Sequence, residues 1–163
     1  MQMVDNKNEV VQNISQGKEA EEMQQFIGIR LGKEIYGIPI EKTREVARFL
    51  QITSIPGTVP QIMGLMNLHG EILCIVDIKI LLNIGNAIPT ENSQVVVVKT
   101  IEGPVGIFCD EIIDIYSVSK KNIETALSTL SSEMGIYIQG QAQVNDGLMG
   151  ILDIERLLFK QEK

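Results

Sequence analysis

Short apolar runs separated by turn-forming residues recur along this chain. The first two runs, Phe26–Leu31 and Ile35–Ile40, flank residues 32–34, and this is the pattern of a β-hairpin. Isoleucine and valine dominate the runs, and both residues favour strands. Pro39 lacks a backbone donor, so it is expected near the end of the second strand. The pattern predicts a protein built mostly of short β-strands.

The same kind of pattern continues to residue 152. Residues 41–47 fit either a short turn of helix or a bulged strand. Pro56-Gly57 and residues 145–147 are strong turn signals. Between such turns, the apolar runs predict further strands at residues 48–55, 64–69, 71–77, 94–100, 105–109, 112–118, 136–144 and 148–152.

Helical spacing is confined to two places. Residues 78–82 show it over a short stretch, and a closing helix is predicted at residues 153–161 with Asp153 as its N-cap. The apolar residues of that helix lie at positions i, i+3 and i+4, which gives it one apolar face. These residues are Ile154, Leu157 and Leu158.

The chain divides into a tail and one folded unit. Residues 1–24 are polar and are expected to form a flexible N-terminal tail. The folded unit is expected at residues 25–160. A linker rich in Gly, Asn, Pro and Thr separates its two strand-rich halves, roughly residues 25–84 and 93–152.

The segment Pro60–Asp77 carries the most information. It is expected to form two strands around a tight turn, in which Gly70 supplies the backbone freedom. The unbroken apolar run Ile72–Val76 predicts a strand covered on both faces. Gly64 and Gly106 each interrupt an apolar strand, which fits either barrel curvature or the close approach of another backbone.

Composition narrows the class of protein. The chain has 163 residues, 44% of them hydrophobic, and a formal net charge of −7. It contains no Lys/Arg cluster of the kind that binds phosphate, so nucleic acid is not an expected partner. Neither a secretory signal nor an apolar run long enough for a membrane span is present, so a cytosolic protein is expected. Cys74 and Cys109 lie inside apolar runs and are expected to be reduced, a disulfide between neighbouring strands being the alternative.

Catalytic chemistry finds little support. His69 is the only histidine, and its spacing from Cys74 does not suit a nucleophile–base pair. Nucleotide-binding glycine motifs and zinc-ligand spacings are absent. Asp77, Asp110 and Asp153 each end an apolar strand, which fits capping better than an acidic metal site. No catalytic residue, cofactor or metal is expected.

Several motifs resemble one family. The spacing Val59-x4-Gly64-x2-Asn67-Leu-His-Gly70, followed by Ile75-Val76-Asp77, resembles the signature of the CheW family of chemotaxis coupling proteins. Further similar segments occur in the family's order. They are Phe26–Ile40, Glu41–Val46, Val105–Ile107 with Asp110 and Val118, and Leu148–Leu158.

The resemblance implies a fold and partners. The fold would be two packed five-stranded SH3-like β-barrels with a short C-terminal helix, without catalysis. The protein would be a cytoplasmic adaptor, a monomer in isolation, that is recruited to membrane arrays through its partners. These would be the regulatory domain of a CheA-type histidine kinase, met mainly by the first barrel, and the cytoplasmic helical hairpin of a methyl-accepting chemotaxis receptor, held between the barrels.

The resemblance also places a receptor-binding groove residue by residue. Three positions would begin the groove, three would come from the signature, and three would line the side of the second barrel. In that order they are Ile40, Thr43 and Glu45; Gly64, Asn67 and His69; and Val95, Gly106 and Ile115.

Position 69 departs from the family pattern, which usually has arginine there. Histidine is smaller and mostly neutral near pH 7. We therefore expect either that coupling depends on pH below about 6.5, the reference pKa of histidine, or that His69 is simply exposed. The alternatives for the whole chain are a coupling protein of a related kinase pathway, for pilus motility or development, and a standalone SH3-like peptide-binding module.

Overall fold

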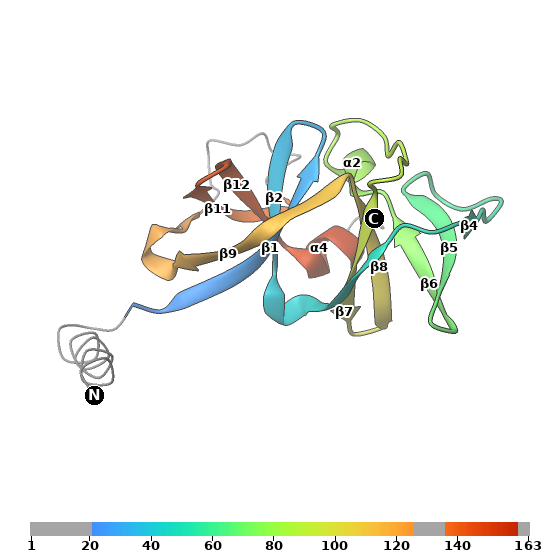
Figure 1. Cartoon of the computed structure of the whole chain (residues 1–163), viewed down its shortest axis with the longest axis horizontal. Helices are drawn as coiled ribbons and strands as arrows, with labels where there is room; N and C mark the ends of the chain where they lie inside the picture. Colours follow the sequence, from blue (N-terminus) through green and yellow to red (C-terminus); the bar gives the residue numbers. More distant parts are fainter. Residues whose placement is uncertain (1–20, 126–135, 160–163) are drawn as a thin grey trace.

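The structure is a computed structural model that describes residues 21–125 and 136–159. Its strands form two six-stranded sheets. We call them the terminal sheet, which contains both ends of the described chain, and the central sheet. The terminal sheet lies at the left of Figure 1 and the central sheet at the right. The prediction of a mostly β protein with a short C-terminal helix is confirmed.

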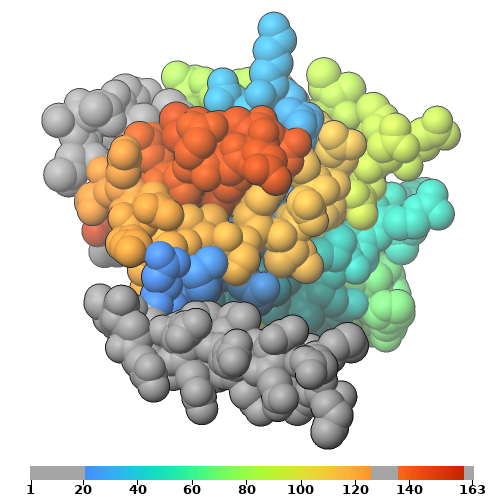
Figure 2. Space-filling view, turned by 60° about the vertical axis from the view of Figure 1, so that its left-hand side comes forward, coloured from blue at the N-terminus to red at the C-terminus, as the bar shows by residue number. Residues whose placement is uncertain are grey.

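The terminal sheet joins the first hairpin to the last four strands. Its order is β10-β11-β12-β2-β1-β9, and β12 runs parallel to β2. The strands are β1 (Met23–Leu31), β2 (Glu34–Pro39), β9 (Glu111–Ser119), β10 (Glu124–Thr125), β11 (Ile138–Val144) and β12 (Gly147–Leu152). Figure 2 shows β9 and the β11–β12 hairpin on one face of the molecule, in orange to red.

The central sheet takes the middle of the chain in the order β3-β7-β8-β6-β5-β4, with β6 parallel to β8. Its strands are β3 (Thr43–Arg48), β4 (Ile52–Thr53), β5 (Ile62–Leu68), β6 (Glu71–Val76), β7 (Gln94–Thr100) and β8 (Gly103–Cys109). The short helices are η1 (Ile40–Lys42), α2 (Ile78–Leu81), η2 (Lys120–Asn122) and α4 (Ile154–Phe159).

The sheets differ from the expected five-stranded barrels. Each has six strands, because the two-residue strands β4 and β10 extend one edge. Within the described residues, the strands at the two ends of each sheet are not paired with each other, so neither barrel is closed. The sheets also do not correspond to the halves 25–84 and 93–152, since β1 and β2 pair with strands from the second half.

Several boundaries differ from those predicted. The strand expected at residues 48–55 is interrupted, because β3 ends at Arg48 and β4 covers Ile52–Thr53. Residues 41–47 contain both of the expected alternatives, a turn of 3-10 helix and then an irregular strand. Strand β1 starts at Met23, inside the expected tail, and residues 1–20 lie outside the described part of the chain.

The core has three parts. A shared core fills the space between the sheets and includes Ile29 and Ile38 of the terminal sheet, Val96 of the central sheet and Leu157 of α4. Each sheet also covers a smaller cluster on its other face. Strand β7 is therefore buried on both faces, as Val95–Val98 are fully inaccessible.

Strand β6 departs from its prediction. The prediction that this strand is covered on both faces is wrong for Ile72, which is 58% exposed. Leu73, Ile75 and Val76 are buried as predicted. The strand lies next to β5, and only one face of its first half meets the core, so the ordinary alternation of buried and exposed residues holds there.

The three strand-ending aspartates all accept hydrogen bonds from backbone N–H groups. Asp77 accepts from the N–H groups of Lys79 and Ala87, and the Asp110 carboxylate accepts from Gly32 N–H and from Lys79 Nζ. Asp153 Oδ1 accepts from Arg156 N–H at 3.2 Å in the first turn of α4. The described residues contain no group of three acidic, histidine or cysteine side chains suited to a metal ion.

Both cysteines are free. Burial, reinforced by Asp110 and Glu111, raises the pKa of the Cys109 thiol to about 12. Among the described helices, none has the length and apolar character needed to cross a membrane.

Candidate partner-binding site

The signature segment forms a tight hairpin turn between β5 and β6. Leu68 pairs with Glu71, so His69 and Gly70 form the two-residue loop, with φ values of 54° and 84°. Two positive φ values are typical of the type I′ turn, whose twist suits a hairpin. Asn67 Oδ1 accepts a hydrogen bond from Gly70 N–H at 3.1 Å. The asparagine and the glycine thus hold the turn, while the side chain of His69 stays 77% exposed.

Charged side chains from β3 meet this turn. Arg44 Nη2 lies 2.7 Å from Glu45 Oε2 and 2.9 Å from Glu71 Oε1. His69 Nε2 lies 3.8 Å from Glu45 Oε1. We call these four residues the charged corner. It joins β3 to the β5–β6 hairpin, although these strands are not neighbours in the sheet.

The electrostatics of the charged corner are uneven. Hydrogen bonds to Glu71 and then Glu45 raise the pKa of the Arg44 guanidinium, so this cation is permanent. Two carboxylates thus face one permanent cation and one imidazole. With His69 neutral the corner carries one net negative charge, and it suits a partner that brings a donor or a positive charge.

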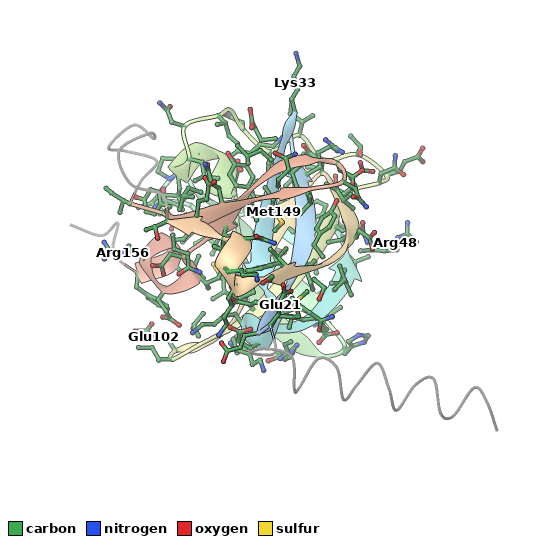
Figure 3. The ribbon with its side chains drawn as sticks, turned by 90° about the vertical axis from the view of Figure 1, so that its left-hand side faces the viewer. Glu21, Lys33, Arg48, Glu102, Met149 and Arg156 are labelled. Carbon is green, nitrogen blue, oxygen red and sulfur yellow. The ribbon has the colours of Figure 1, made fainter. Side chains whose placement is uncertain are left out.

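A groove of about 740 Å³ lies between the central sheet and α4. Its apolar residues come from four places: the segment leading into β5 and β5 itself, β6, the β7–β8 turn with β8, and α4. They are Val59, Ile62, Cys74, Val76, Ile101, Val105, Leu158 and Phe159, with Gln61 and Glu102 as the polar members. In Figure 3, Glu102 of the β7–β8 turn lies on the same side of the molecule as Arg156 of α4, and Arg48 at the end of β3 lies on the other side.

The groove and the start of β3 are close to each other. Thr43 pairs with Val98 across β3 and β7, and Val98 pairs with Val105 across β7 and β8. Two strand spacings of about 4.8 Å therefore separate Thr43 from a groove residue, roughly 10 Å in all. Lys42 Nζ also lies 3.6 Å from Glu155 Oε2, which ties η1 to α4.

Five of the nine predicted site residues lie at the accessible surface, in or beside the central sheet. Glu45, Asn67 and His69 surround the hairpin turn, Thr43 begins β3, and Ile40 packs at the margin of the shared core. These residues are partly or fully exposed.

The other four lie elsewhere. Val95 is fully buried, and a Cβ placed on Gly106 would lie 2.6 Å from Ile75 Cδ1 and 2.8 Å from Val95 Cγ1. The space beside Gly64 is filled by the backbone of Thr53 and Ser54. The neighbours of both glycines are thus parts of this chain. Ile115 is 53% exposed, but on β9 of the terminal sheet.

Sequence reasoning missed the groove. None of the nine predicted residues lines it, and Arg44 of the charged corner was also not among them. One usable signal was present. Ile101 is an apolar residue in a turn, and it is 86% exposed, so it is free to contact a partner.

Comparison with known families matches residues 25–162 to the CheW-like domain. The chain is 32% identical over 142 residues to the chemotaxis protein CheW of Klebsiella aerogenes, covering 85% of this chain and 84% of that protein. It is 27% identical over 146 residues to the chemotaxis protein CheW of Helicobacter pylori, covering 90% and 88%.

The fold has a counterpart among solved structures. A crystal structure of the scaffolding protein TtCheW from Thermoanaerobacter tengcongensis superposes with a TM-score of 0.78, covering 89% of this chain and 94% of that one. The sequence identity is 23%, so this match supports the fold.

Proposed function

This chain belongs to the CheW family of non-catalytic chemotaxis scaffold proteins, and on that premise we propose that it couples chemoreceptors to a CheA-type histidine kinase. The receptor's cytoplasmic helical hairpin occupies the groove between the central sheet and α4. The charged corner, at the turn of the β5–β6 hairpin, supplies further polar contacts. The kinase's regulatory domain docks on another surface, mainly within residues 25–84.

The observation that carries the proposal is the apolar groove between the central sheet and α4. A helix bound in a groove needs an apolar trough and a few polar anchors beside it. The trough is lined by residues such as Ile62, Val105 and Leu158, and its polar members are Gln61 and Glu102. Partners of this kind bring the protein to the membrane, and it works in the cytoplasm without a cofactor.

Reconstitution tests the proposal. Receptor fragments, a CheA-type kinase and this protein are sedimented together, and kinase activity is measured with and without the protein. We expect a ternary assembly in which the kinase is activated only when the protein is present. A kinase that sediments and is activated equally without the protein would contradict the proposal.

A matched pair of substitutions locates the receptor. Ile101→Glu places a charge at the groove, where Ile101 is 86% exposed. Ile88→Glu makes the same change at an isoleucine that is 70% exposed and does not line the groove. We expect Ile101→Glu to weaken receptor binding about tenfold and Ile88→Glu to change it less than about twofold. Equal effects would place the receptor elsewhere.

A further inference from the structure

The two oxygens of the Glu45 carboxylate have different neighbours. Oε2 accepts hydrogen bonds from Arg44 Nη2 at 2.7 Å and Nε at 3.1 Å. Oε1 faces His69 Nε2 at 3.8 Å. The first two distances are those of charge-assisted hydrogen bonds, and the third is too long for a hydrogen bond. Glu45 is thus bound by Arg44 and only approached by His69.

Arg44 also fastens the turn that carries His69. Its Nη2 lies 2.9 Å from Glu71 Oε1, and Glu71 directly follows the His69-Gly70 loop. Strands β3 and β6 are separated in the sheet by β7 and β8, so this side-chain link joins two strands that do not pair with each other. The guanidinium is suited to this position because its planar fork reaches two carboxylates at once.

We infer that Arg44 is a positioning residue of the partner-binding site and that it shares Glu45 with His69. Arg44 is the permanent counter-charge that holds Glu45 against the turn. His69 is a second, titratable counter-charge on the free oxygen of the same carboxylate. The consequence for partner binding rests on the proposed function, whereas the sharing of Glu45 does not.

The inference changes where pH dependence should be found. Glu45 from β3 faces the His69 ring at 3.8 Å, and Arg44 links Glu45 to Glu71 of β6. While Arg44 is present, Glu45 has a charged partner at every pH, so partner binding should vary little between pH 8 and pH 6. Without Arg44, only a protonated imidazole can replace it, and histidines become protonated below about pH 6.5.

Four variants test this with receptor-fragment binding at pH 8 and pH 6. Arg44→Gln removes the charge, and Arg44→Lys keeps the charge but loses the fork. Arg44→Gln combined with His69→Asn also removes the titratable group, since asparagine tolerates the positive φ of position 69. Arg48→Gln is the control, because Arg48 is an exposed arginine on β3 without an ion pair within the described part of the chain.

We expect Arg44→Gln to bind about fivefold more weakly than the parent at pH 8 and to recover to within about twofold at pH 6. The double variant should not recover, Arg44→Lys should be intermediate, and Arg48→Gln should stay within about twofold at both values. An equal loss for Arg44→Gln at both pH values, or a loss no larger than that of Arg48→Gln, would overturn the inference.

A second readout needs no partner. The chain has one histidine, so NMR can monitor the titration of a single imidazole. Removing the nearby cation and freeing Glu45 both favour the protonated ring. The titration in Arg44→Gln should therefore move to higher pH than in the parent, and Glu45→Gln should reverse that movement. An unmoved titration refutes the sharing of Glu45. A moved titration without receptor binding by the parent supports the sharing and refutes the proposed function.

Discussion

The interior and the rim of the central sheet both contain residues that were predicted for the receptor-binding groove, but in different surroundings. In the interior, Val95 and Gly106 touch only other parts of the chain, and no solvent reaches Val95. At the rim, Glu45 of β3 lies 3.8 Å from His69 of the β5–β6 turn, and both side chains are accessible. The family resemblance assigned all four to the receptor-binding groove. The difference shows that such residues include some that build the fold and some that are free to meet a partner.

Enlarging Gly106 should have the largest effect on the interior of the central sheet. A Cβ there would press on the side-chain ends of Ile75 and Val95, at 2.6 and 2.8 Å. We expect Gly106→Val to lower the free energy of unfolding by about 3 kcal/mol and Gly106→Ala by about 1 kcal/mol, because a packed core accommodates added volume poorly. Urea unfolding measures both. A Gly106→Val protein of unchanged stability that fails to bind receptor would place Gly106 in the partner site.

Alkaline pH should weaken the interior next. Burial raises the pKa of Cys109 from 9.0 to about 12 and that of Tyr36 from 10.0 to about 12. A group whose pKa is raised by folding stabilises the fold below its unfolded pKa and loses that contribution as the pH approaches its folded pKa. Stability should therefore be level up to about pH 9 and fall between pH 9 and 12. Urea unfolding at pH 7, 8.5 and 10.5 checks this, and constant stability across the three values would contradict it.

The sequence predicted the local strands and turns better than the way in which they combine. The hairpin at residues 26–40 and the turn at Gly70 depend on neighbouring residues, so alternation and turn chemistry were enough to place them. The pairing of β12 with β2 and of β6 with β8 depends on contacts between distant segments, and no local pattern encodes it.

The same rule applies to the site. Asn67 and His69 could be placed from the turn alone. The groove could not, because Ile101, Val105 and Leu158 come from segments that only the tertiary fold brings together. The role of Arg44 also depends on β3 lying beside a hairpin that is not its neighbour in the sheet.

The two cysteines allow one measurement to compare the groove with the buried interior. Cys74 is half-buried and lines the groove, whereas Cys109 is fully buried in the shared core. Alkylation of the native protein at pH 8 should therefore modify Cys74 and spare Cys109, which serves as the internal control for folding.

The rate of Cys74 alkylation, measured with and without a saturating receptor fragment, shows whether the receptor occupies the groove. A receptor hairpin in the groove should slow this reaction at least about fivefold while Cys109 stays unmodified. If the fragment binds while Cys74 reacts at an unchanged rate, the groove between the central sheet and α4 is not the surface that the receptor covers.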